Sequence, residues 1–174
     1  MKHWRTQIIA LLFGVWAATA HADDPCAGFK WDVAPERALF AADARALSAV
    51  RDADSAPELA SGQLYGISLL PQASVALRVP AGPKSSFAGA FAGFARLNIA
   101  AGGIYRVSLD QPGWIDLVGE QGVIPSSDFS GQRGCSAPHK VVQFTLPAGR
   151  ILLQLTGIGS AQVRLTLIRA PATP

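Results

Sequence analysis

The clearest alternation of apolar and polar residues in this chain lies just before its Gln-Pro-Gly turn at residues 111–113. Proline presets φ and glycine accepts positive φ, so this tripeptide favours a tight turn. A second apolar segment, residues 114–118, follows at once. The pattern predicts a β-hairpin of the kind found in a sandwich. In its first strand Tyr105, Val107 and Leu109 share one face, and Arg106 and Ser108 share the other.

Short apolar segments separated by turn residues continue through most of the chain. In residues 142–146 and 163–167 every second residue is apolar, which is typical of strands with one buried and one solvated face,. We therefore expect an all-β fold, a two-sheet antiparallel sandwich of the jelly-roll kind with one N-terminal helix. The predicted strands are Leu64–Leu70, Ser74–Val79, Phe91–Ile99, Gly103–Leu109, Trp114–Val118, Lys140–Leu146, Ile151–Leu155 and Gln162–Arg169.

The predicted helix covers Pro35 to Val50. This segment is rich in alanine, and its larger apolar residues recur near helical spacing,. Pro35 suits the first helical position and Glu36 suits the first turn. Residues 51–62 are polar, and we expect a solvated loop there.

Residues 1–22 have the three parts of a secretory signal peptide. Lys2 and Arg5 give a positive start, residues 8–18 are almost entirely apolar, and Ala-His-Ala at the end matches the cleavage pattern,. The apolar run of about eleven residues falls short of the ~20 that a transmembrane helix needs. We therefore expect residues 23–174 to form a single β-sandwich domain, periplasmic or secreted, with no transmembrane segment after cleavage.

The basic character of the whole chain arises largely from this leader. The chain has 15 Lys and Arg against 12 Asp and Glu, with an isoelectric point near 9.2. Cleavage would remove Lys2 and Arg5 and no acidic residue, which leaves 13 against 12. No basic run or basic–aromatic pattern remains, so we expect no nucleic-acid partner.

Cys26 and Cys135 are the two cysteines of the chain. In an exported protein an isolated pair favours a disulfide, which would join the mature N-terminus to the loop before the last strands. A reactive thiol and a metal ligand are the alternatives. Both fit less well, because neither cysteine has a Cys or His neighbour at ligand spacing.

The chain offers few residues for catalysis. Two of its three histidines lie in the predicted signal peptide, so His139 alone would remain. Non-haem iron and catalytic zinc sites generally need at least two histidines, and we expect no metal and no other cofactor. A Ser–His–Asp triad would have to join His139 to Asp128 and to Ser126, Ser127 or Ser130, which lie in turn-rich sequence,.

Asp110 and Asp116 flank the central turn and come closest to the paired carboxylates of a glycosidase,. Asp110 suits a turn-forming role. Asp116 shares a strand face with Trp114 and Val118, so either it is buried beside the tryptophan or that whole face lies near the rim of the sheet. If it is buried, it must pair with Arg106 or another arginine, or with backbone amides. Its removal should then cost about 3–5 kcal/mol.

Polar positions on the last strands are the candidate for a binding surface that could hold a glycan or an envelope protein. A solvated face without a function has the same pattern. Trp31 and Trp114 could stack on a sugar, although large aromatic side chains are more often part of a core. The outward array comprises Gln143, Thr145, Gln154, Thr156, Arg164 and Thr166. The candidate surface comprises Trp114, Asp116, Arg106, Gln143, Gln154 and Arg164.

Two parts of the chain resemble exported proteins. Residues 144–155, with Asp-Leu-Val at 116–118, resemble bacterial pre-peptidase C-terminal-type domains, which are secreted jelly-roll sandwiches attached to peptidases. The Cys-x-x-Phe-x-Trp-Asp start and the Tyr-Arg-Val-Ser-Leu…Trp-Ile-Asp-Leu-Val core resemble small stand-alone exported proteins of proteobacteria with no established activity. Some chains of that kind carry a homogentisate-dioxygenase label, but a single histidine fits such an iron site poorly.

The function that these patterns favour is an exported, non-catalytic binding or accessory module of unknown ligand. A secreted enzyme, either a hydrolase or a dioxygenase, with a site that the sequence does not reveal is one alternative. An envelope protein-interaction module is the other.

Overall fold

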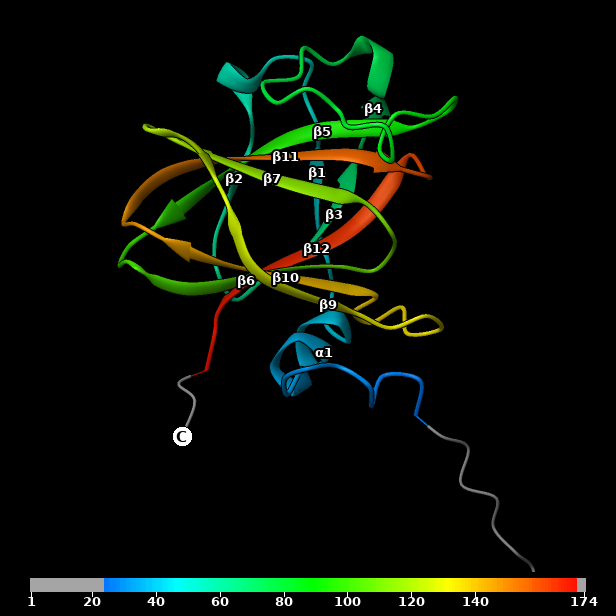
Figure 1. The fold of residues 1–174 in the computed structure, drawn as a ribbon, viewed down its shortest axis with the longest axis vertical. Coiled ribbons are helices and arrows are strands. Elements are labelled where there is room, and N and C mark those ends of the chain that lie inside the picture. Colours follow the sequence, from blue (N-terminus) through cyan, green and yellow to red (C-terminus); the bar gives the residue numbers. More distant parts are fainter. Residues whose placement is uncertain (1–23, 172–174) are drawn as a thin grey trace, which may run out of the picture.

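The protein is a sandwich of two six-stranded β-sheets in the computed structural model, which describes residues 24–171 (Figure 1). The predicted fold class is therefore confirmed. The first sheet has the order β1 (Arg45–Ser48), β3 (Leu64–Ser68), β12 (Gln162–Arg169), β6 (Gly103–Leu109), β10 (Lys140–Leu146) and β9 (Ser126–Gly131). The second has the order β2 (Glu58–Leu59), β5 (Phe91–Ile99), β11 (Gly149–Ile158), β7 (Trp114–Gly119) and β8 (Gly122–Ile124), with β4 (Leu70–Pro71) also paired to β5.

The apolar residues of the predicted alternation pack between the two sheets. Every second residue of the long central strands lies in one continuous apolar core, and burial of this area drives the two sheets together. The first sheet contributes Tyr105, Val107, Leu109, Val142, Phe144, Leu146, Val163, Leu165 and Leu167. The second contributes Leu97, Ile99, Ile115, Leu117, Ile151, Leu153 and Leu155.

The central turn does not form a hairpin, which corrects the sequence prediction. Strand β6 belongs to the first sheet and β7 to the second, so residues 110–113 carry the chain from one sheet to the other. A Cβ at Gly113 would collide with Cδ1 of Ile158, so a larger residue at this crossing would require the end of the Ile158 side chain to move. Alternation alone cannot distinguish this crossing from a hairpin, since both leave one buried face on each strand.

The predicted helix is wrong in its second half. Helix α1 covers Ala34–Phe40, and the segment Arg45–Ser48 is instead β1, which pairs in parallel with β3. The helical propensity of alanine is small enough for tertiary pairing to override it. Leu47 packs against the core from this edge strand.

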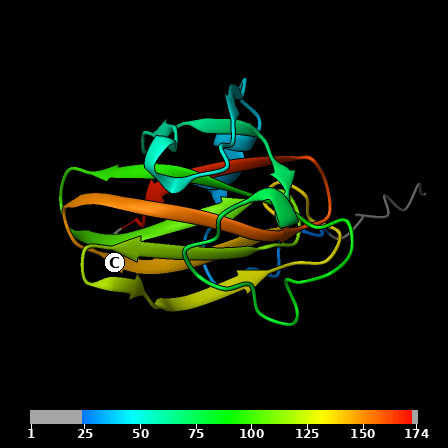
Figure 2. The ribbon, with the colours of Figure 1, turned by 90° about the horizontal axis from the view of Figure 1, so that it is seen from above.

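The predicted strand Ser74–Val79 is also absent from the described part of the chain. A short 3₁₀ helix, Gln72–Ser74, leads instead into a loop of residues 75–90, which lies over one end of the second sheet (Figure 2). A second 3₁₀ helix, Ala53–Ser55, lies within the predicted polar loop. Conversely, β8 and β9 form where the sequence predicts turns.

The predicted disulfide is confirmed. Cys26 and Cys135 are bonded, with their Cα atoms 5.1 Å apart, so residues 24–33 are held at one end of the first sheet. A disulfide is typical of an oxidising compartment outside the cytoplasm. Within residues 24–171 no helix has the length and apolar character to cross a membrane. The predicted signal peptide, residues 1–22, lies outside the described residues.

Candidate functional site

The outer face of the first sheet is covered by the N-terminal segment and α1 (Figure 1). Glu36 of α1 is completely buried there, and Arg106 of β6 places Nη1 3.5 Å from its Oε1. Arg106 also donates to the backbone oxygen of Asp32 and to Oε1 of Gln143, and its guanidinium lies 4.8 Å from the Trp31 ring centroid. Burial raises the pKa of Glu36, which Arg106 opposes only in part,.

Arg164 completes this attachment of α1. Its guanidinium donates to the backbone oxygen of Phe40 and to Oδ2 of Asp110, and its own amide donates to Oδ1 of Asp110. Arg106 and Arg164 therefore hold the N-terminal segment, and Gln143 accepts from Arg106, so these side chains are engaged in structural contacts although Arg164 is partly exposed. Asp110, which was paired with Asp116 in the glycosidase hypothesis, is bound within this structural contact.

The residues of the hypothetical triad make separate contacts. His139 places Nδ1 3.2 Å from the Cys135 backbone oxygen, and Asp128 accepts from Lys30. Ser127 donates to the Gln143 backbone oxygen, and Ser130 accepts from the Lys30 amide. This geometry does not assemble a nucleophile, a base and an orienting acid.

One end of the outer face of the second sheet is covered by the loop of residues 75–90, and two glutamines fix the loop there. Gln154 of β11 is completely buried; its Oε1 accepts from the amides of Arg78 and Val79, and its Nε2 donates to the Val79 backbone oxygen. Gln72 accepts from the Gly157 amide and donates to the Ser85 backbone oxygen. Half of the array predicted to be outward is buried: Gln154 and Thr156 of the second sheet and Thr166 of the first are each at most 1% exposed.

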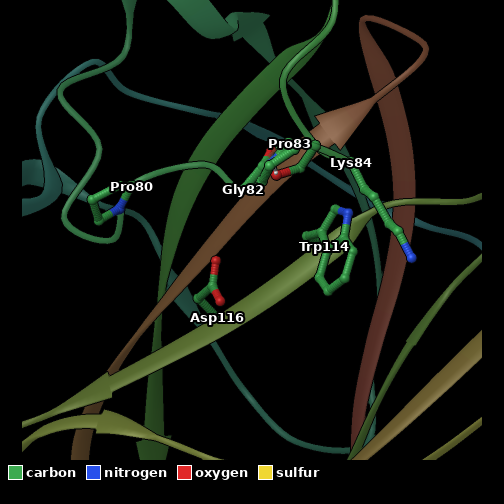
Figure 3. A pocket seen from close by; sticks show the side chains of 7 residues that line it. Pro80, Gly82, Pro83, Lys84, Trp114 and Asp116 are labelled. Carbon is green, nitrogen blue, oxygen red and sulfur yellow. Dashed lines mark hydrogen bonds between the residues drawn. The ribbon is translucent and has the colours of Figure 1, made fainter.

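Trp114 and Asp116 lie beside this loop on the same side of β7 (Figure 3). Trp114 is 45% exposed, unlike the core tryptophan that the sequence favours. The two side chains and residues 80–85 line a hollow of about 450 Å³. Gly157 has φ +62°, and it lets the loop approach closely, since a Cβ there would lie 2.8 Å from Ser85 Cα.

Two further hollows adjoin Trp114. The hollow toward the sandwich edge measures about 310 Å³, and Asp116, Phe129 and Lys140 line it together with Trp114. The third measures about 440 Å³ and extends from Trp114 to Arg133. They are open because the short strand β8 pairs only with residues 117–119 of β7 and leaves the first half of that strand uncovered. We call the three hollows together the Trp114 site.

Two titratable groups of the Trp114 site have shifted pKa values. Burial raises the pKa of Asp116, against the opposing effects of a 3.4 Å hydrogen bond donated by Gln154 and of the Lys140 charge. Burial lowers the pKa of Lys140, and Asp116 opposes this shift. The Lys140 ammonium donates to the Gly113 backbone oxygen at 2.6 Å and lies 5.3 Å from the Trp114 ring centroid. Shifted groups beside an exposed aromatic ring are typical of functional sites.

The predicted partner of Asp116 is wrong. No arginine or backbone amide within residues 24–171 bonds its carboxylate, and Gln154 supplies the hydrogen bond instead. Arg106 lies in the other sheet, under α1. The expected cost of 3–5 kcal/mol therefore loses its basis, because no buried arginine is left unpaired when Asp116 is removed.

We expect Asp116→Asn to be at least as stable as the parent at pH 7. Because the pKa of Asp116 is raised in the folded protein, folding favours the protonated carboxyl over the carboxylate. The protonated carboxyl therefore contributes its full stability below about pH 4, and this stability is lost as the pH rises through the pKa of the folded protein. Asparagine is neutral at every pH, so it keeps this stability at pH 7. The difference in free energy of unfolding between Asp116→Asn and the parent should therefore disappear as the pH falls below about 4. Urea unfolding at pH 7 and pH 3.5 measures this. A loss of about 3 kcal/mol at pH 7 would restore the structural role.

The structure divides the six predicted surface residues between the two sheets. Trp114 and Asp116 line the Trp114 site, and Gln154 lies buried beneath it. The other three lie on the first sheet. Arg106 is buried under the N-terminal segment, Gln143 accepts from Arg106, and the partly exposed Arg164 bonds Phe40 and Asp110. The site also contains residues that no sequence pattern singles out: Lys84, Phe129, Arg133 and Lys140.

No protein-family model matches the chain, and no curated protein matches it either. The resemblance to pre-peptidase C-terminal-type domains and to stand-alone proteobacterial proteins therefore stays a prediction. A β-sandwich serves proteins of many functions, so the function must be inferred from the residues of the site.

Proposed function

We propose that this protein is a non-catalytic binding module that holds a saccharide at the Trp114 site. The observation that supports this most is the half-exposed Trp114 ring at the meeting point of three hollows, with a carboxylate and an ammonium beside it. Contiguous exposed apolar side chains, such as Trp114, Val123 and Phe129 around one hollow, often mark a binding site,. Hollows of this size, mostly apolar with a few polar groups, suit small ligands or single units of a polymer.

The chemistry of these side chains suits a sugar ring. The apolar C–H face of a pyranose can lie flat on an indole ring, which gives contact area at little cost in side-chain entropy. The Asp116 carboxylate can accept hydrogen bonds from ring hydroxyls, and Lys84 can donate to them,. The glutamine-anchored loop gives a fixed wall to the site, so binding would not have to order it,.

The small number of carboxylates around the site favours saccharide binding over saccharide hydrolysis. Asp116 is the single carboxylate lining the three hollows among the described residues. Glycosidases of the common kinds use two carboxylates on either side of the bond that is cleaved. Within residues 24–171, no group of three or more His, Cys, Asp or Glu side chains is placed to hold a metal ion. The expected lack of metal stays a prediction.

The proposed location is the periplasm or the cell exterior. The signal-peptide pattern of residues 1–22 supports export, and the disulfide between Cys26 and Cys135 supports an oxidising compartment,. Envelope polysaccharides and extracellular polymers are the saccharides that such a module would meet.

We expect Trp114→Ala to weaken saccharide binding by about 30-fold or more, because the ring supplies the stacking surface at the centre of the site. A glycan array identifies ligands for the parent, and isothermal titration compares the variants. Phe87→Ala is the matched control, since Phe87 is 49% exposed and lines a different hollow. Equal binding by Trp114→Ala and the parent, or an array on which nothing binds, would contradict the proposal.

A protein partner is the second candidate function. Trp114, Val123 and Phe129 are all exposed and line the same hollow, and clustered exposed apolar side chains often mark protein interfaces,. A pull-down from envelope extract with the parent and with Phe129→Ser tests it. Retention of one defined protein by the parent and its loss from the variant would favour this candidate, and retention of none would remove it.

A further inference from the structure

Positive charge gathers on one side of Trp114, in the third hollow. Three cations, Lys84, Arg133 and Lys140, line it together with the His139 ring and the two exposed aromatic side chains, Trp114 and Phe129. No carboxylate lines it among the described residues. We call this part of the Trp114 site the basic hollow. Its basic residues come from two segments about 50 residues apart in sequence, so the fold, and not a local basic run, assembles it.

Two of these cations are free to bind a ligand. Lys84 and Arg133 are exposed, and neither has a carboxylate oxygen within 4.0 Å in the part of the chain that the structure describes. By contrast, Lys30, Arg37, Arg78 and Arg150 each pair with an acid on the surface. Lys140 adds a third charge at the rim, close to the Trp114 ring.

We propose that the basic hollow binds the acidic group of an acidic saccharide while the sugar ring lies on Trp114. This inference rests on the proposed function and names its ligand class. A carboxylate, sulfate or phosphate on the sugar would form charge-assisted hydrogen bonds with the Arg133 guanidinium and the Lys84 ammonium. Clustered charge of one sign in a recess also raises the rate at which a ligand of opposite charge associates.

The distribution of charge favours a saccharide over a nucleic acid. The basic residues occupy one hollow of about 440 Å³ and do not form a stripe that could follow a phosphate backbone,. Asp116 lies at the far side of the same tryptophan, where it would repel a second acidic group and accept a hydroxyl. A ring with one acidic group and several hydroxyls matches both sides of Trp114.

The test uses matched pairs of oligosaccharides. Tetramers of galacturonate, mannuronate and hyaluronan are titrated beside the same tetramers after reduction of their carboxyl groups to alcohols. We expect the parent to bind at least one acidic form about tenfold or more tighter than its neutral counterpart. In Lys84→Gln/Arg133→Gln this preference should fall below about threefold. Arg45→Gln/Arg51→Gln removes the same charge at exposed positions outside the Trp114 site and should keep the preference.

The outcomes separate this inference from the proposed function. Equal binding of acidic and neutral forms that still depends on Trp114 would overturn the acidic preference and leave the saccharide function standing. An unchanged preference in Lys84→Gln/Arg133→Gln would place the acidic group elsewhere and overturn the inference. Binding of no tetramer would overturn both. Tighter binding of a ten-nucleotide thymidine oligomer, lost in the same double variant, would assign the hollow to nucleic acid.

Discussion

Arg106→Ala should lower the free energy of unfolding by about 3–5 kcal/mol, because it leaves Glu36 buried and without its cation. Glu36 is 0% exposed, and Arg106 is the arginine that faces it. The substitution also removes the donor to the Asp32 backbone oxygen and the cation that lies over Trp31. Both contacts hold the N-terminal segment on the first sheet. Urea unfolding, followed by circular dichroism at pH 7, measures the loss.

Arg150→Ala is the matched control. Arg150 pairs with Glu58 at 3.0 Å, but both side chains are more than half exposed, so this substitution should cost about 1 kcal/mol or less,. Adding Glu36→Gln to Arg106→Ala should restore part of the stability, since it removes the unpaired buried charge. Equal effects of Arg106→Ala and Arg150→Ala would show that the buried pair contributes no more than a surface pair.

Loss of the disulfide should be the other large effect. The bond joins residues 109 apart in sequence, and chain-entropy models credit a closed loop of that length with about 4–5 kcal/mol as an upper figure,. Cys26→Ser/Cys135→Ser should therefore unfold at a distinctly lower urea concentration than the parent. Reduction of the parent should reproduce most of this shift, and reduction of the variant should have no effect.

A thiol assay of the unfolded, unreduced parent gives the accompanying check. It should detect no free thiol, because both cysteines of the chain are in the bond. Two free thiols, or a midpoint that does not move on reduction, would show that the bond is missing or does not constrain the folded chain.

The long central strands were predictable because their pattern reflects burial. Phe91–Ile99, Gly103–Leu109, Lys140–Leu146 and Gln162–Arg169 have the predicted bounds, and each places alternate residues in the core. Ser74–Val79 has a similar pattern but forms no strand in the structure, since the Gln154 side chain takes the amides of Arg78 and Val79. Here a side chain bonds the backbone amides that a neighbouring strand would otherwise bond, and the local alternation of apolar and polar residues does not reveal this.

The candidate site was predictable only in part, for a related reason. Trp114 and Asp116 lie in the apolar segment directly after the Gln-Pro-Gly turn, where a lone acid between apolar residues stands out in the sequence. Lys84 and Arg133 lie in loops far apart in sequence, and only the crossings between the sheets bring them to one hollow. Arg106 and Arg164 have the same outward positions as a binding array, yet both bond residues of α1, Arg106 to Glu36 and Arg164 to Phe40. Strand alternation predicts on which face of a sheet a side chain lies, but it does not predict which other segment of the chain packs on that face.

An NMR titration of the ¹⁵N-labelled parent with the saccharides bound on the array tests the central claim most directly. The account predicts a large shift of the Trp114 indole N–H, with further shifts at Asp116, Lys140 and residues 80–85, which line the same hollows. The Trp31 indole contacts the guanidinium of Arg106, which belongs to the first sheet, away from the Trp114 site. Its N–H signal should not shift and serves as an internal control. Shifts that gather around Trp31 and leave Trp114 unmoved would contradict the account.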